Sequence, residues 1–339
     1  MSGIIGHSVY AVLGMQAAAE RGIPLAYLIH RQFSSYLAGA YLGSDVQIVP
    51  AVTCVATGKG YGCCGMKIER CPETGGAVEA WRLQHDGHEY SGAEISAKFY
   101  GRAHVIFGFA KADDHLAIGW VRLADYAAAA VEDTFDLFPP SERTVAYVLG
   151  WLVHVVSDSL IKSFQPGITL HLVDGKYTPK NRPLQDVYCC HEVGVKRLGL
   201  HWDAVLRDCA ELAWEPAQLH YMRIGERRGR LGQLFPGGWL PERSLAEAVL
   251  QENRRHFRSY SLEELNAVRL RDGECSAEIR RSTGLDYAGI VAACERAGYR
   301  NALRQMGEQV ALMFARVTEK SPRLARLPAK GFPPWSRTL

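Results

Sequence analysis

The sequence predicts a mainly α-helical protein, a multi-helix bundle with a small β insertion. Its 339 residues are 47% hydrophobic and 22% charged, as in an ordinary globular protein that buries a core. Residues 4–20 and 141–163 are long apolar segments that predict helices. Residues 50–100 differ in character, because Gly, Cys and Thr accumulate there. Within them, EAWRLQHDGHEYSG predicts two short strands joined by a turn at Asp86-Gly87.

The remaining elements follow in chain order. Helices are expected over residues 4–20, 24–42, 95–110, 120–133, 141–163, 184–199, 201–213, 243–256, 261–271, 276–282, 286–297 and 299–318. Residues 164–183 are rich in Pro, Gly and Asn and predict a long loop, and the prolines after Ser321 predict an extended end. We expect a helical metal-binding core over residues 1–200, which carries the insertion at 50–100, and a C-terminal helical extension over 201–339.

Location and partners are only weakly constrained. The chain has no run of about 18 uncharged apolar residues, so no transmembrane helix is expected. The first residues lack a basic region and contain His7 and Gln16, so they do not resemble a signal peptide. We therefore expect a cytoplasmic protein, or a secreted one if a presequence precedes these residues.

Arg and Lys are concentrated in Met222–Arg230 and in residues 320–339. These segments are either solvated or attract phosphate groups.

The segment GWLVHVVSDSL, residues 150–160, holds two chemically active side chains in an apolar setting. His154 and Asp158 are four residues apart, so on a helix they share a face. Burial of a carboxylate is costly unless it has a partner. The two side chains therefore form either a structural His–Asp pair or part of a site that faces a cation.

Three further groups lie in similarly apolar surroundings. His7 lies within GIIGHSVYAVLGM, Asp45 follows the helix that ends in LAGAYLGSD, and His104 lies within FYGRAHVIFGF. Helical bundles build metal sites from such side chains on facing helices. Imidazole nitrogens and carboxylate oxygens are the ligands of catalytic zinc.

The order of these motifs resembles the zinc-dependent phospholipase C family, which is related to the single-strand-specific zinc nucleases. The order is a helical His, then GSD, then a separate His, then AYVLGWLVHVVSD. The clearest element is Gly150-x3-His154-x3-Asp158. The resemblance covers residues 1–200 without the insertion, and it implies a helical bundle of the zinc phospholipase C type.

The resemblance also implies a set of metal ligands. One zinc ion would be held by Asp45, His104, His154 and Asp158, while a second would share Asp158 and add His7. In the family, the N-terminal amine binds this second ion. Removal of Met1 would expose the amine of Ser2, although the family begins with a Trp that this chain lacks.

A third family site matches poorly. The family has a His six residues beyond the Asp, where this chain has Phe164. It then has a His and a carboxylate one helical turn apart, whereas His191 and Glu192 are adjacent. Neighbours on a helix point about 100° apart, so they do not substitute simply. We therefore expect two zinc ions, with the third site weak or lost.

The implied activity is hydrolysis of a phosphoester, and in particular of a phosphodiester in a phospholipid or a nucleic acid. Two zinc ions would polarise the phosphoryl oxygen and lower the pKa of a bridging water. Asp45 would serve as both ligand and general base. The alternative is a non-catalytic or partly metal-depleted helical binding or scaffold protein, which Phe164 favours.

The cysteines of the insertion allow several states. Cys54, Cys63, Cys64 and Cys71 have the spacing C-x8-C-C-x6-C, which contains no C-x2-C pair. Two disulfides, a separate structural metal and free buried thiols all remain open. The insertion lies between Asp45 and His104 in the sequence, so we expect it to cover the site and select substrates.

Overall fold

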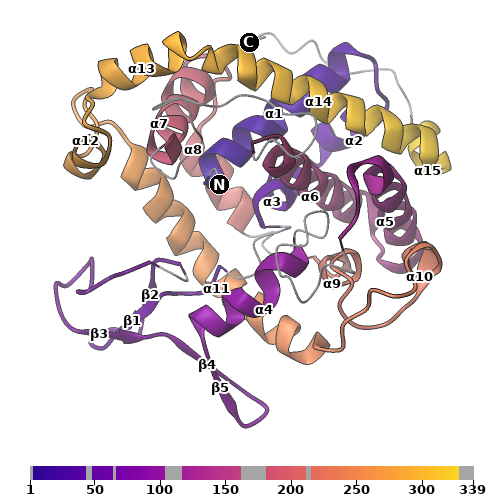
Figure 1. Cartoon of the computed structure of the whole chain (residues 1–339), viewed down its shortest axis with the longest axis horizontal. Helices are drawn as coiled ribbons and strands as arrows, with labels where there is room; N and C mark the ends of the chain where they lie inside the picture. Colours follow the sequence, from indigo (N-terminus) through magenta and orange to yellow (C-terminus); the bar gives the residue numbers. More distant parts are fainter. Residues whose placement is uncertain are drawn as a thin grey trace.

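The computed structural model describes residues 3–42, 48–63, 66–103, 117–161, 181–210 and 215–327 (Figure 1). The structure is mainly helical with two small sheets, which confirms the predicted class. The helices are α1 (Ile4–Glu20), α2 (Leu25–Arg31), α3 (Phe33–Leu42), α4 (Gly92–Ala103), α5 (Leu123–Leu137), α6 (Ser141–Ile161), α7 (Asn181–Tyr188), α8 (Trp202–Ala210), α9 (Ala217–Tyr221), α10 (Gly229–Leu234), α11 (Arg243–Val268), α12 (Ala277–Thr283), α13 (Tyr287–Arg296), α14 (Tyr299–Lys320) and α15 (Pro322–Ala325). A 3-10 turn over Trp120–Arg122 precedes α5, and a π-helix over Cys189–Val195 continues α7.

Some predicted helices have different limits. The single helix predicted over 24–42 is α2 and α3, because Gln32 leaves the helical region with φ −112° and ψ 38°. The two helices predicted over 243–256 and 261–271 are the continuous α11. The hydroxyl of Ser261 donates to the Arg258 carbonyl oxygen at 3.1 Å, so this serine is satisfied inside the helix and does not end it. Helices α9, α10 and α15 were not predicted.

The centre of the molecule is built from α1, α3 and α6, with α5, α11 and α14 around them (Figure 1). Every residue from Ile4 to Ala18 in α1 is buried. Of the residues that the structure describes, only Glu142–Ile161 of α6 form a helix long and apolar enough to cross a membrane, and residues 144–161 of it are all buried within the protein. Core helices have this composition too, so α6 is not a clear transmembrane segment. One hydrophobic core runs from α1 to α15.

Two glycines let α3 and α6 cross at close range. A Cβ atom added to Gly39 would lie 2.0 Å from the Tyr147 carbonyl oxygen, and one added to Gly150 would lie 2.0 Å from the Tyr36 carbonyl oxygen. Both separations are far below van der Waals contact, and the obstructing atoms are backbone. The Gly150 of the sequence motif therefore has a structural role, because it brings the backbone of α3 against the helix that carries His154.

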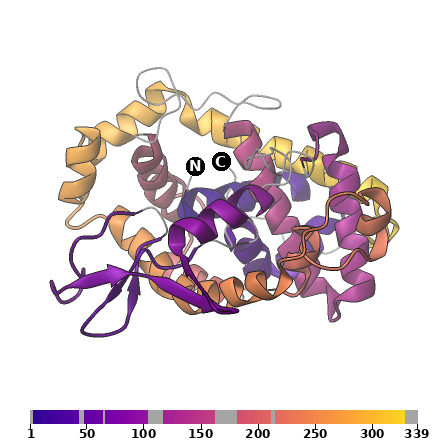
Figure 2. The ribbon, with the colours of Figure 1, turned by 60° about the horizontal axis from the view of Figure 1, so that its bottom comes forward.

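The β insertion projects from the helical body beside α11 (Figure 2). Strands β1 (Val52–Cys54), β2 (Gly60–Tyr61) and β3 (Val78–Ala80) form an antiparallel sheet in the order β2-β1-β3. Strands β4 (Arg82–His85) and β5 (His88–Ser91) form the predicted hairpin. Its turn residues Asp86 and Gly87 both have positive φ angles, 48° and 75°, as a two-residue hairpin turn requires.

Two side chains of α11 hold the insertion against the helical body. The backbone N–H of Gly62 donates to Glu263 Oε2 at 3.1 Å, and the His256 ring donates from Nε2 to the Gly62 carbonyl oxygen. His256 is buried, and burial lowers its pKa although the bond to Gly62 acts in the opposite direction. The ring is therefore neutral at pH 7.

We predict that Gly150→Ala destabilises the fold by about 1–3 kcal/mol or more, because the added methyl group meets the α3 backbone and not a side chain that can turn away. The free energy of unfolding, measured by denaturant titration, checks this. Gly119→Ala is the matched control, because a Cβ atom at Gly119 would meet nothing within 4 Å. Equal stability of the two variants would contradict the proposed close crossing.

We predict that His256 contributes to acid sensitivity. Its folded pKa is lowered, so its contribution to stability is fully present above the unfolded value of about 6.5 and is lost as the pH falls through the folded value. In His256→Gln, the slope of unfolding free energy against pH should be smaller below pH 6.5, by up to ~1.4 kcal/mol per pH unit. Denaturant titrations between pH 5 and 8 measure this slope. Identical slopes in the variant and the wild type would refute the assignment.

Candidate metal centre

The structure brings together three of the side chains singled out in the sequence. His7 comes from α1, and His154 and Asp158 come from α6. Each is at most 1% exposed. Helices α1 and α6 pack directly on each other, and the four-residue spacing places His154 and Asp158 on the same face of α6. This His7–His154–Asp158 cluster is the candidate metal centre.

The carboxylate of Asp158 faces both imidazoles. Its Oδ1 atom lies 3.7 Å from His7 Nε2, and its Oδ2 atom lies 4.0 Å from His154 Nε2. The two rings are stacked, with centroids 3.9 Å apart and planes inclined by 7°. One ligand atom from each of the three residues can be chosen so that all lie within 4.8 Å of one another.

The separations within the cluster exceed an N–H···O hydrogen bond, whose length is about 2.7–3.2 Å. They suit ligands of a common cation better. With zinc–ligand bonds of about 2.0–2.2 Å, two ligand atoms lie about 3.3–3.6 Å apart at a tetrahedral angle and up to about 4.4 Å apart on opposite sides of the ion. The 3.7 Å separation is close to the tetrahedral value, and the 4.0 Å separation is somewhat longer.

A backbone carbonyl fixes the orientation of the His154 ring. His154 Nδ1 lies 2.9 Å from the carbonyl oxygen of Ala40 in α3. A carbonyl oxygen only accepts, so Nδ1 carries a proton and donates it. In a neutral ring Nε2 then presents its lone pair on the side of Asp158, which is the tautomer that a metal requires. Metal-binding histidines are commonly held in this way by a hydrogen bond from the other ring nitrogen.

Aromatic rings surround His7. Tyr10 lies edge-on to it with centroids 5.7 Å apart, and Tyr41 lies at 6.4 Å. Both tyrosines are buried. A charged carboxylate in such surroundings loses its hydration, and it needs positive charge close by. A metal ion bound at these side chains would supply that charge.

Two of the expected ligands cannot be placed. Asp45 and His104 lie outside the described residues, as do Phe164 and the first two residues of the chain. The parts of the prediction that assign a base to Asp45, a ligand to His104 and an amine ligand to Ser2 therefore stay predictions.

The side chains of His191 and Glu192 have other partners. They lie on the π-helix, where His191 Nε2 donates to the Val268 carbonyl oxygen at 2.9 Å. Burial lowers the pKa of His191. Glu192 accepts hydrogen bonds from Lys196 and Tyr287, which lower its pKa against the opposing effect of burial. Within the described part of the chain, the only group suited to a metal does not include either residue.

Ala40 and Gly39 contribute to the candidate metal centre, and the sequence analysis did not identify either residue. Ala40 acts through its carbonyl oxygen, so its residue type carries no signal of the role. The usable signal is the pair of glycines, Gly39 and Gly150, which mark where the two helices meet.

Two cysteines of the insertion, Cys54 and Cys71, are buried free thiols. Cys63 is partly buried, and Cys64 lies outside the described residues. Of the states left open by the sequence, the structure therefore has free buried thiols at Cys54 and Cys71.

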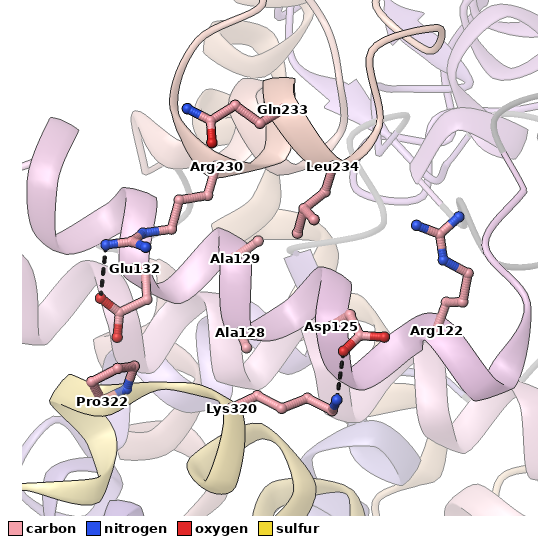
Figure 3. Close-up of a pocket in the computed structure, with 10 residues that line it drawn as sticks. All are labelled: Arg122, Asp125, Ala128, Ala129, Glu132, Arg230, Gln233, Leu234, Lys320 and Pro322. Carbon is pink, nitrogen blue, oxygen red and sulfur yellow. Dashed lines mark ion pairs between the residues drawn. The ribbon is translucent and has the colours of Figure 1, made fainter.

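A pocket of about 430 Å³ lies elsewhere, between α5, α10, α14 and α15 (Figure 3). Two of its basic side chains, Arg230 and Lys320, come from the two Arg- and Lys-rich segments, and the third is Arg122. Arg230 pairs with Glu132 at 3.7 Å and Lys320 pairs with Asp125 at 2.6 Å. These charges are offset by acidic residues of α5, and no residue of α1 or α6 lines the pocket. The pocket is thus separate from the candidate metal centre.

The chain was compared with models of protein families, with curated proteins and with solved structures, and none of the three comparisons gave a match.

Proposed function

We propose that the protein is a metal-dependent hydrolase of phosphoesters, in particular phosphodiesters, and that zinc bound at His7, His154 and Asp158 is required for its activity. The observation that carries the proposal is the position of one buried carboxylate between two stacked imidazoles, at distances too long for hydrogen bonds and suited to metal ligation. The resemblance of the motif order to zinc-dependent phospholipases C supplies the reaction class.

The donor set supports zinc over harder cations. It contains two imidazole nitrogens and one carboxylate, the combination typical of catalytic zinc, whereas magnesium and calcium prefer an all-oxygen shell. Catalytic zinc ions keep one coordination position open for a water or a substrate oxygen. When bound, zinc would supply a Lewis acid for the phosphoryl oxygen and a water of lowered pKa.

The groups around the cluster orient its ligands and lower the polarity of its surroundings. The Ala40 carbonyl holds the His154 ring in one tautomer and one orientation. The two oxygens of Asp158 face different imidazoles, an arrangement that suits a carboxylate shared between two ions. Tyr10 and Tyr41 surround His7 with aromatic carbon, which lowers the local polarity and strengthens the electrostatic interactions of the site.

A second candidate function is a non-catalytic helical binding or scaffold protein of the same fold. Phe164 favours it, because it stands where the resemblance implies a third metal ligand. In that case the His7–His154–Asp158 cluster is a structural element of the core. The two functions differ in what the cluster needs, since a structural cluster keeps its place without metal.

We predict that Asp158→Asn removes at least one zinc ion per chain and lowers phosphodiesterase activity by ~10²–10³, because a negative charge between dications is lost. Unfolding of the zinc-loaded variant should also occur at a lower temperature than that of the wild type, since zinc binding to the folded state stabilises it. The measurements are elemental analysis, hydrolysis of bis(p-nitrophenyl) phosphate, and thermal unfolding with and without added zinc.

Asp133→Asn is the matched control. Asp133 is also buried, and it accepts a hydrogen bond from His220 at 2.7 Å as well as the Arg230 and Leu231 amides at the start of α10. This substitution should lower stability and leave the zinc content unchanged. If wild type and Asp158→Asn contain the same amount of zinc, Asp158 is no ligand; if wild type takes up none, the scaffold function is correct.

A further inference from the structure

The β insertion contains the same turn twice, 17 residues apart in the sequence. The first turn, residues 54–59, begins at Cys54. The Cys54 carbonyl oxygen accepts the Gly58 N–H at 2.8 Å, and the Cys54 N–H donates to the Lys59 carbonyl oxygen at 2.9 Å. Gly58 has φ +67°, and the Thr57 hydroxyl accepts the Lys59 N–H at 3.4 Å.

The second turn, residues 71–76, repeats each of these features. The Cys71 carbonyl oxygen accepts the Gly75 N–H at 2.8 Å, and the Cys71 N–H donates to the Gly76 carbonyl oxygen at 2.9 Å. Gly75 has φ +70°, and the Thr74 hydroxyl accepts the Gly76 N–H at 3.2 Å. The shared sequence is Cys-x-x-Thr-Gly. The spacing between the cysteines alone, C-x8-C-C-x6-C, does not reveal this repeat.

Strand pairing places the two turns at the same end of the sheet. The first turn follows β1 and the second precedes β3. These strands are antiparallel, with Cys54 opposite Val78, so the end of β1 adjoins the start of β3. Cys54 and Cys71 thus lie together with Tyr61 in a small apolar cluster of their own, separate from the main core.

The two sulfur atoms interact. The Cys54 side chain hydrogen-bonds to Cys71, and the Thr74 N–H donates to Cys71 Sγ at 3.4 Å. The Thr74 hydroxyl also lies 3.8 Å from Cys54 Sγ. Burial opposes ionisation of the Cys71 thiol, but these hydrogen bonds outweigh it and lower its pKa to about 6. Cys71 is therefore largely a thiolate at neutral pH, the reactive form of cysteine.

Other buried cysteines have the opposite chemistry. Burial raises the pKa of Cys190 and that of Cys294 to about 12, and it also raises the pKa of Cys275. Those thiols lie in the helical body and remain protonated. In the insertion, by contrast, residues 55–59 and 72–75 are exposed, so the two turns that carry the sulfurs lie at the protein surface.

The repeated turn has the chain spacing of a zinc-ribbon turn, in which each Cys-x-x-Cys supplies two thiolates. Here Thr57 and Thr74 occupy the positions of the second cysteines. Two sulfurs are too few for a four-thiolate zinc site but are sufficient for a disulfide. The described residues include no group of three metal-ligating side chains at this position.

We propose that Cys54 and Cys71 form a redox-active dithiol that hydrogen peroxide converts to an intramolecular disulfide. The Cys71 thiolate attacks one peroxide oxygen, the O–O bond breaks, and hydroxide leaves and takes up a proton to form water. Cys71 is now a sulfenic acid. Cys54 loses its proton and attacks the Cys71 sulfur, the S–O bond breaks, and a second water leaves. Two thiols and one peroxide thus give one disulfide and two waters.

Peptide mapping of the full chain tests this proposal. The protein is treated with hydrogen peroxide at pH 7, its remaining thiols are blocked with N-ethylmaleimide, and the digest is analysed by mass spectrometry. We expect one cross-link between Cys54 and Cys71, which dithiothreitol reverses. Cys54→Ser should leave Cys71 as a sulfenic acid that dimedone traps. Cys275→Ser, the matched control at a thiol of raised pKa, should form the cross-link as the wild type does.

Three results would overturn the proposal. The first is that peroxide-treated wild type carries N-ethylmaleimide on both Cys54 and Cys71. The second is a cross-link from Cys71 to Cys63 or Cys64 in place of Cys54. The third is oxidation of Cys71 to a sulfinic acid in wild type without any cross-link. Since the wild-type protein gives each of these results directly, the test does not depend on the folding of a variant.

Discussion

The burial of the Asp158 carboxyl group is the constraint on which the proposed metal centre depends. Its side chain has no exposed surface, and an ionised carboxylate in the interior costs several kcal/mol unless positive charge compensates it. We propose that zinc held by Asp158 together with His7 and His154 supplies this charge, because one ligand atom from each of the three side chains lies within 4.8 Å of the others.

The packing of the helices brings the three side chains and the Ala40 carbonyl together. Helix α3 must come close enough to α6 for the Ala40 carbonyl to reach His154, and Gly39 and Gly150 permit that approach. Helix α1, which brings His7, is itself covered by α14, where a Cβ atom on Gly14 would lie 2.3 Å from Val310 Cγ1. Helix α14 therefore supports the helix that carries His7, although it contributes no ligand among the described residues.

Much of this arrangement could be predicted from sequence, for identifiable reasons. Helices α1 and α6 are long and apolar, and the spacing of His154 and Asp158 shows a shared face. The Asp86-Gly87 turn is a strong local signal, and the hairpin there was correct. Sequence could not show that His7 stacks on His154, because this depends on how two distant helices cross. It also could not show that Ser261 stays inside a helix, which a local hydrogen bond decides.

The insertion shows a different limit. The proposed thiol chemistry depends on two turns that lie at the same end of the sheet because β1 pairs with β3. The spacing of the cysteines does not indicate this arrangement, whereas the Cys-x-x-Thr-Gly repeat does indicate that the two turns are alike. We thus propose two sites of distinct character in one chain. The proposed metal centre lies among apolar helices, and the proposed dithiol lies at the rim of a small sheet.

The most direct test of the metal centre is a crystal structure of the zinc-soaked protein with anomalous data collected at the zinc edge. The account predicts one or two strong peaks, each within about 2.0–2.2 Å of Nε2 of His7 or His154 and of an Asp158 carboxylate oxygen. No anomalous density in that position, with Asp158 hydrogen-bonded directly to a protonated imidazole, would contradict it and leave the cluster as a structural element of the core.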